Sequence, residues 1–131
     1  AFERVCLQHV PHSQAALGIA GVQTNVCSWF SRGTEERRGA QIDLVMQRAD
    51  GVTDLCEMKH SSNVFTIDRD YAMNLQNKLE AYQELSKDKR TLHLVMVTTN
   101  GVAHNNNYNL VQNEVTMDNL FSPLDGRVSR V

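Results

Sequence analysis

The sequence predicts an α/β protein with a mixed central β-sheet flanked by helices. Two observations predict this class: apolar segments of strand length alternate with helical patterns, and their order is helix, strand, strand, strand, helix, strand, strand. A chain of 131 residues with 41% apolar and 21% charged residues has the composition of one globular domain with its own core. We therefore expect a single domain over residues 1–131, built on an αβββαβ core.

Short helices and three strands are expected in the first half of the chain. Apolar residues recur at helical spacing from Phe2 to Val10, and Pro11 ends that helix because it disfavours the helical conformation of the preceding residue. A second short helical piece then reaches Leu17. The expected strands cover residues 22–30, about 40–48 and 53–59, and the polar loop covers 31–39.

The second half contains the clearest helix of the sequence. Apolar side chains recur every three or four residues from Asp68 to Leu85, and Asp68 is expected to be the N-cap. Residues 92–97 are nearly all apolar, which is typical of a central strand covered on both faces. A last strand is expected within residues 111–117.

Acidic and basic side chains lie on two adjacent predicted strands. Glu57 and Lys59 are two residues apart, so they project from one face about 7 Å apart along the strand. Asp43 comes from the preceding strand. A three-residue loop over 49–51, with Gly51 in the left-handed conformation, places position 43 opposite position 57, whereas a two-residue turn directs Asp43 away. A catalytic site therefore requires the three-residue loop or a bulge.

These residue types suit the cleavage of a phosphodiester. Carboxylate oxygens select Mg²⁺ or Mn²⁺, which polarise a phosphoryl oxygen and lower the pKa of a bound water. A lysine supplies positive charge where negative charge develops. The alternative interpretation is that Glu57 and Lys59 form a cross-strand ion pair facing solvent. Leu55 shares their face and indicates that the face is partly buried.

Composition excludes several classes of protein. A net charge of −2 and a pI near 6.2 argue against strong non-specific nucleic-acid binding, which depends on many lysines and arginines. The three cysteines are too widely spaced for a disulfide framework or a zinc knuckle, so buried free thiols are expected. No apolar run approaches about 18 residues, which predicts no membrane contact and a cytoplasmic protein.

A family resemblance extends over almost the whole chain. The segments that carry it are Phe2-Glu3-x-x-Cys6-Leu7-x-His9, Ala16-Leu17-Gly18-Ile19, residues 39–44 (GAQIDL), Cys56-Glu57-Met58-Lys59 and residues 111–116 (VQNEVT). They resemble the C-terminal nuclease-like domain of bacterial AAA-type ATP-binding proteins, within the PD-(D/E)xK nuclease superfamily. The resemblance implies a restriction-endonuclease-like core and a fragment of a longer chain that has an upstream ATPase domain. No P-loop motif occurs here, so these residues themselves are not expected to bind ATP.

The resemblance also implies roles for individual residues. Asp43, Glu57 and the backbone carbonyl of Met58 correspond to metal ligands, with Mg²⁺ or Mn²⁺ as the cofactor. Lys59 corresponds to the residue that orients the attacking water or stabilises the transition state. Ile42 stands where the superfamily has its variable proline.

Two further residues correspond to additions that only some members have. Glu3 matches an acidic residue on the first helix, and Gln76 matches a glutamine after the Glu-x-Lys strand. The usual spacing to a following tyrosine is not kept, because Tyr82 lies six residues after Gln76.

The expected function is that of a metal-dependent phosphodiesterase acting on DNA. The alternative is a catalytically inactive regulatory or oligomerisation domain of an ATP-binding protein. Three arginines of the polar loop, Arg32, Arg37 and Arg38, either meet phosphates or belong to a solvated loop. Trp29 and Phe30 are expected in the core rather than as a platform for base stacking.

Overall fold

The computed structural model describes residues 2–36 and 38–121 and confirms the α/β class. Five strands form one sheet in the order β1-β2-β3-β4-β5. The pairs β1/β2 and β2/β3 are antiparallel, whereas β3/β4 and β4/β5 are parallel. The strands are β1 (Thr24–Ser31), β2 (Ala40–Arg48), β3 (Val52–Lys59), β4 (Thr91–Thr98) and β5 (Asn113–Thr116).

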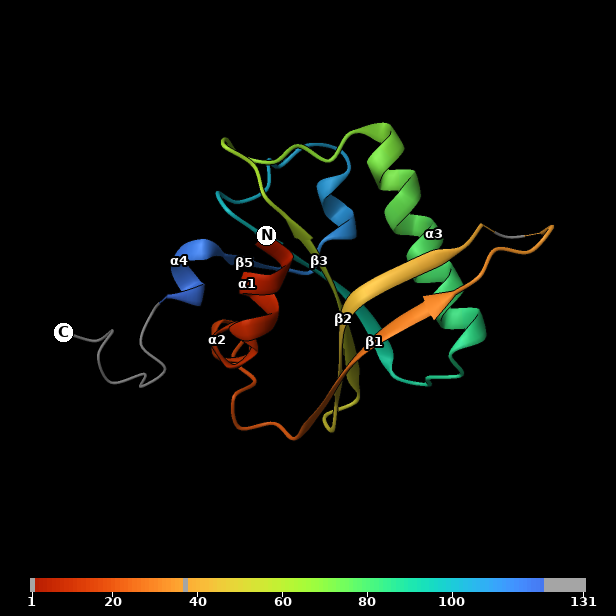
Figure 1. Ribbon diagram of the computed structural model, residues 1–131, viewed down its shortest axis with the longest axis horizontal. Helices are drawn as coiled ribbons and strands as arrows, with labels where there is room; N and C mark the ends of the chain where they lie inside the picture. The colour runs from red at the N-terminus through yellow and green to blue at the C-terminus, as the bar shows by residue number, and fades with distance from the viewer. Residues whose placement is uncertain (1, 37, 122–131) are drawn as a thin grey trace.

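Helices cover the two faces of the sheet. On one face lie α1 (Phe2–Gln8), α2 (Val10–Ala16) and α4 (Met117–Leu120), and α3 (Arg69–Leu85) lies on the other (Figure 1). A short 3₁₀ helix, η1 (Tyr108–Leu110), precedes β5. The helix α3 connects the parallel strands β3 and β4, so the main elements follow the predicted αβββαβ order. The helix α2 is the second short helical piece that the sequence predicted before the first strand.

The core divides along the pleat of the strands. Cys56 and Met58 of β3 pack against the α1 side, and Leu55 packs with Tyr82 of α3. This alternation follows from the two-residue period of a strand. It places the odd-numbered residues of β3, which include Glu57, on the same side as α3.

Local sequence signals act as expected at both helical regions. The chain breaks between α1 and α2 at His9, and Pro11 lies in the first turn of α2, where its missing N–H costs nothing. Asp68 caps α3 by accepting a hydrogen bond of 2.8 Å from the Tyr71 backbone N–H. The predicted cap is confirmed, whereas the break lies at His9 and Val10, which precedes Pro11, is itself helical.

The β2–β3 connection is the three-residue loop that the catalytic interpretation requires. Leu44 pairs with Cys56 and Gln47 pairs with Thr53, so residues 49–51 form the loop. Gly51 has a φ of 93°, a conformation that favours glycine. Its N–H donates to the Arg48 carbonyl at 3.3 Å. The recorded pairing of β2 with β3 ends at Leu44 and Cys56, one residue before positions 43 and 57.

A β-bulge lies in the outer hairpin at the same place. Cys27 of β1 pairs with Val45, but Trp29 pairs with Ile42, so two residues of β2, Asp43 and Leu44, lie opposite a single residue of β1. Bulges bend a strand and redirect its side chains, and they are common beside functional sites. The bulge thus falls on a predicted metal ligand.

The cysteines and the helices bear on two further expectations. Cys6 and Cys56 are buried free thiols as predicted, and Cys27 is half-buried. Burial raises the pKa of Cys6 to about 11 and that of Cys56 well above its ordinary value.

Within the described part of the chain, no helix has the length and apolarity needed to cross a membrane.

Candidate active site

Glu57 is the centre of the candidate site. It lies near the end of β3 and is only 9% exposed. Burial raises the pKa of its carboxyl, a hydrogen bond and charge from Lys78 act in the opposite direction, Asp43 raises the pKa further, and Lys59 lowers it. Asp43 and Lys59 therefore lie close enough to Glu57 for their charges to act on its carboxyl.

Lys78 is a site residue that sequence reasoning missed. It lies on α3, and its Nζ is 2.8 Å from Oε1 of Glu57. Tyr71, Leu75 and Lys78 are spaced at i, i+4 and i+7, so they share the face of α3 that packs on the sheet. A lysine within this largely apolar stripe was the signal that could have revealed it.

Lys59 is held by an aromatic ring instead of by a carboxylate. Its Nζ lies 4.8 Å from the centroid of the Tyr71 ring, a cation–π contact. Burial, and next the charge of Glu57, raise the pKa of the Tyr71 hydroxyl. Among the residues that the structure describes, no carboxylate forms an ion pair with Lys59. The alternative ion pair of Glu57 with Lys59 is thus not formed, and Lys78 takes that place.

Asp43 is exposed where the pairing of β2 with β3 ends. The last recorded pair is Leu44 with Cys56, one residue before Asp43 and Glu57. The carboxylate of Asp43 accepts a hydrogen bond of 2.8 Å from the side-chain amide of Gln41. Asp43 is consequently open to solvent and to a ligand, while Glu57 is buried against α3.

Glu3 lies beside the end of β3. With Phe2, Val5, His60 and Met117 it lines a hollow of about 550 Å³. The rings of Phe2 and His60 are 5.7 Å apart, which ties the start of α1 to the residue that follows Lys59. A site role for Glu3 remains a prediction.

Gln76 does not lie at the site. It is on the exposed side of α3, where its amide donates to Glu80 at 3.2 Å. It borders a different hollow, together with Leu79, Gln83 and Arg90. The assignment from sequence is corrected here: Lys78, two residues further along the helix, faces Glu57, because a displacement of two residues turns a helical side chain to nearly the opposite side.

The donor atoms of the site can be compared with the needs of a divalent metal. In the described segments, no group of three or more His, Cys, Asp or Glu residues is arranged to hold an ion. Asp43 and Glu57 nevertheless supply two carboxylates, and Mg²⁺ is usually bound by one or two carboxylates with waters and substrate phosphates. The backbone carbonyl of Met58, on the same strand, is the third predicted donor. The donor chemistry fits Mg²⁺ or Mn²⁺, with Lys78 occupying one oxygen of Glu57.

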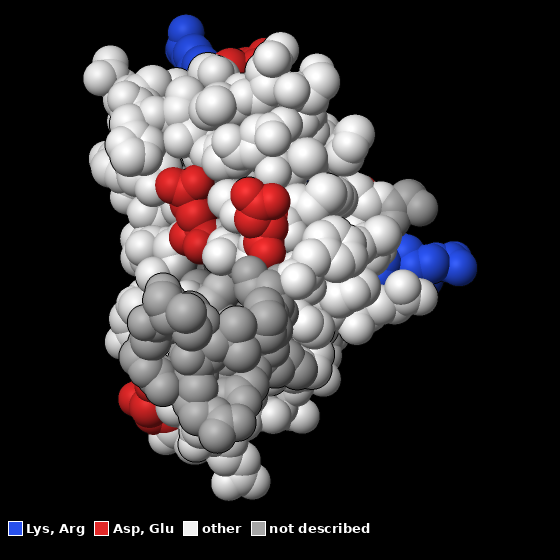
Figure 2. Space-filling view, turned by 90° about the vertical axis from the view of Figure 1, so that its left-hand side faces the viewer, with Lys and Arg blue, Asp and Glu red and all other residues white. Residues whose placement is uncertain are grey.

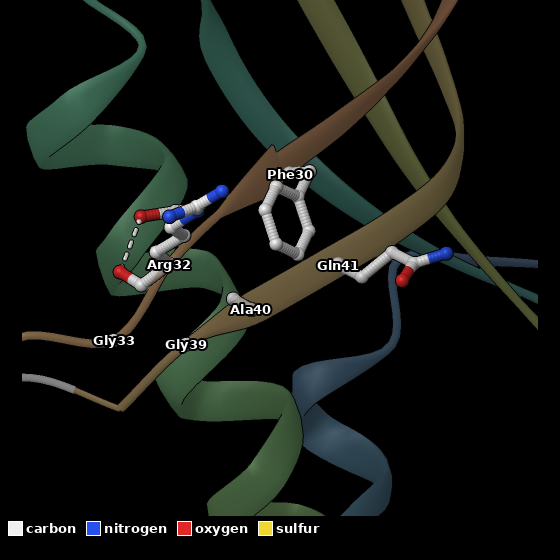
Figure 3. A pocket seen from close by; sticks show the side chains of 7 residues that line it. Phe30, Arg32, Gly33, Gly39, Ala40 and Gln41 are labelled. Carbon is white, nitrogen blue, oxygen red and sulfur yellow. Dashed lines mark hydrogen bonds between the residues drawn. The ribbon is translucent and has the colours of Figure 1, made fainter.

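A second hollow lies at the far end of the β1–β2 hairpin. Its volume is about 410 Å³, and it is lined by Phe30, Ser31, Arg32, Gly33, Gly39, Ala40 and Gln41 (Figure 3). The expectation for the two aromatic residues here is half right. Trp29 packs edge-on against Tyr82 with centroids 5.3 Å apart, but Phe30 is 64% exposed because it lies on the opposite face of β1.

A buried polar cluster at the opposite end of β3 has a structural explanation. Asp88 accepts hydrogen bonds from the hydroxyls of Thr53 and Tyr82, both at 2.7 Å, and from the Arg90 N–H at 3.0 Å. Burial alone would raise the pKa of Asp88, but these hydrogen bonds lower it to about 2. The cluster joins the start of β3 to the end of α3 and the start of β4.

Comparisons with known proteins support the fold. No protein-family model matches the sequence, and no curated protein matches it either. A solved structure titled "Crystal Structure of Protein of Unknown Function AF1548" is similar, with a TM-score of 0.54 and 16% identity over 87% of this chain. This chain spans 64% of the length of that protein. The likeness concerns the arrangement of the elements, so function has to be argued from the residues.

Proposed function

We propose that the domain is a metal-dependent phosphodiesterase that cleaves DNA. The observation that carries this proposal is that one carboxylate, Asp43, and two lysines, Lys59 and Lys78, act on the charge of Glu57. They come from three elements, Asp43 on β2, Glu57 and Lys59 on β3, and Lys78 on α3. Two carboxylates next to unpaired positive charge form a site for a divalent cation and for the anionic phosphate that the cation would hold.

Each residue has a task in this proposal. Asp43 and Glu57 would hold Mg²⁺ or Mn²⁺, with the Met58 carbonyl as a further donor. The bound ion would supply Lewis acidity and a more acidic water. Lys59, held over the Tyr71 ring and without a carboxylate partner among the described residues, would stabilise negative charge as it develops on the phosphoryl group. Lys78 orients the Glu57 carboxylate.

The charges of the surface indicate how DNA would be bound. In Figure 2, which views the molecule from the side of α4, acidic side chains lie near the centre of the visible face and basic ones only at its edges. Where this face is described, it offers no cluster of cations to a phosphate backbone. With a net charge of −2, contacts to DNA would be local to the site.

A cleavage assay tests the proposal. The protein is incubated with plasmid and with single-stranded DNA in Mg²⁺ or Mn²⁺, beside Asp43→Ala, Lys59→Ala and an EDTA control. We expect the parent protein to cleave DNA when the metal is present and not in EDTA. The cleavage rate should fall at least about 100-fold in Asp43→Ala and in Lys59→Ala. Gln76→Ala is the matched control and keeps full activity, because Gln76 faces away from Glu57. Absence of cleavage in every sample, or equal cleavage by Asp43→Ala, contradicts the proposal.

One observation favours a second function, that of an inactive regulatory or oligomerisation domain of an ATP-binding protein. Lys78 forms an ion pair of 2.8 Å with the Glu57 carboxylate. If this ion pair is permanent, Asp43 is the only one of the two predicted carboxylate ligands that can bind a metal. Under this alternative, Mn²⁺ does not raise the melting temperature, and the partner is an ATPase domain of the kind that the family resemblance implies.

A further inference from the structure

We infer that the exposed face around Phe30 is a subsite on which an unpaired base of single-stranded DNA stacks, next to the phosphodiester that is cut. The inference rests on the proposed function, because it adds a substrate class to the same site. It assigns a role to the hollow at the end of the β1–β2 hairpin, which the proposed chemistry does not use.

The hollow has the shape and the composition of a base-stacking site. Phe30 is 64% exposed, and the neighbouring wall consists of Gly33, Gly39 and Ala40, which leave room beside the ring. Figure 3 shows the Phe30 ring with Arg32 on one side of it and Gln41 on the other. An exposed aromatic ring next to a cation is the combination that binds single strands, since the ring stacks a base and the cation meets a phosphate.

One residue, Gln41, links this hollow to Asp43 of the candidate site. Phe30 pairs directly with Gln41 across the hairpin, so their side chains are neighbours. Gln41 in turn donates to the Asp43 carboxylate at 2.8 Å. Positions 41 and 43 are about 7 Å apart along β2, a step comparable to one extended nucleotide. A base on Phe30 would therefore belong to a nucleotide adjacent to the phosphate at Asp43.

The open face of the hairpin leaves space for a strand of DNA. The helices α1 and α2 pack with β3 and with Leu44 and Met46 of β2, but the cluster that they form does not include Phe30 or Gln41. On the other face of the hairpin lies α3 (Figure 1). Arg32 is exposed and has no carboxylate partner among the described residues, so its charge is free to meet a phosphate.

The charge of the chain explains why stacking would matter. Non-specific binding of duplex DNA relies on many lysines and arginines, and a net charge of −2 does not provide them. Stacking on an aromatic ring contributes affinity that does not depend on neutralising phosphates. Bases within a duplex are already stacked on their neighbours, so a ring on a sheet surface can take up a base only from an unpaired strand.

Fluorescence anisotropy with a short labelled oligothymidylate tests the inference, in EDTA so that no cleavage occurs. We expect Phe30→Ala to weaken binding at least about fivefold, and Phe30→Trp to retain it. Phe121→Ala is the matched control, because Phe121 is 61% exposed but follows α4 instead of lying on the β1–β2 hairpin, and its ring contacts His9 edge-on. An oligonucleotide of the same length without bases should bind equally to the parent protein and to Phe30→Ala.

The outcomes separate this inference from the proposed function. If the parent protein cleaves DNA while Phe30→Ala binds the oligothymidylate as tightly as the parent, the stacking subsite is wrong and the phosphodiesterase stands. An equal loss for the oligonucleotide without bases also overturns the subsite, since the ring would then not contact a base. If the parent protein neither binds nor cleaves any DNA, both proposals fail.

Discussion

Lys78 of α3 and Glu57 of β3 form an ion pair of 2.8 Å that joins the long helix to the strand of the candidate site. The side chains of Lys78 and Glu57 are 24% and 11% exposed, respectively, so both charges are partly removed from water. In such a setting, loss of one partner leaves the other charge uncompensated. The pair therefore affects both the stability of the fold and the charge available to a metal.

Replacement of Lys78 by methionine is expected to destabilise the protein by about 2 kcal/mol at pH 7, because the buried Glu57 carboxylate loses its partner. Urea unfolding followed by circular dichroism measures the change. Lys89→Met is the control for loss of a lysine from an exposed position and should lie within about 0.5 kcal/mol of the parent. Equal destabilisation by Lys78→Met and Lys89→Met would show that the ion pair with Glu57 does not contribute to the free energy of unfolding.

The same ion pair should compete with a divalent metal for Glu57. In Lys78→Gln, the carboxylate is free to bind the ion, so Mn²⁺ is expected to raise the melting temperature more than it does in the parent protein. Thermal unfolding at increasing Mn²⁺ concentration measures the difference. Asp43→Asn should reduce the shift in both backgrounds, because it removes a predicted ligand. A larger shift in the parent than in Lys78→Gln would instead make Lys78 a residue that helps the metal to bind.

The low pKa of Asp88 predicts a loss of stability in acid. Its pKa is about 2 in the folded protein against an ordinary 3.8, so the unfolded chain binds the proton more readily. The stabilisation from the carboxylate is therefore complete above about pH 4 and is lost as the pH falls towards 2. Asp88→Asn should cost about 2 kcal/mol at pH 6 and nearly nothing at pH 2. Urea unfolding of the parent protein and of Asp88→Asn between pH 2 and pH 6 measures this loss. A difference in stability between the two proteins that stays the same at every pH would contradict the low pKa of Asp88.

The conformation of Gly51 should matter more than its small size. Gly51→Ala places a side chain at a φ of 93°, which we expect to cost about 1 kcal/mol or more. Gly21→Ala is the matched control, because Gly21 also has no atom within 4 Å of an added Cβ but lacks a positive φ. Urea unfolding compares them. An equal effect of the two substitutions would show that the loop does not depend on the left-handed conformation.

Particular residues show how far sequence reasoning could reach. The strand β3, the Asp68 cap and the three-residue loop at Gly51 follow from local patterns, because periodicity and turn chemistry act over a few neighbouring residues. The recorded pairing of β2 with β3 ends at Leu44 and Cys56, and Asp43 lies near enough to Glu57 to raise the pKa of its carboxyl. The sequence left a bulge in the β2–β3 hairpin as the alternative to this loop, whereas the bulge in the structure lies between β1 and β2.

Other residues of the site could not be placed from local patterns. Gln76 and Lys78 lie on one helix with similar polarity, and the choice between them depends on how α3 is rotated against the sheet. Trp29 and Phe30 are both aromatic, and the alternation of β1 decides that Trp29 packs on Tyr82 while Phe30 faces solvent. Neither choice is encoded in the residue type itself.

The sequence by itself determined the α/β class, the order of the elements, and the carboxylates and lysine at the end of the hairpin. These properties depend on hydrophobic period, caps and turns, which are short-range. Tertiary structure alone decided that Lys78 neutralises Glu57, that Lys59 lies over Tyr71, and that Phe30 borders an open hollow linked to Asp43 through Gln41. Those contacts arise between segments far apart in the chain, and only the packing of α3 and the hairpin on the sheet sets which side chains meet.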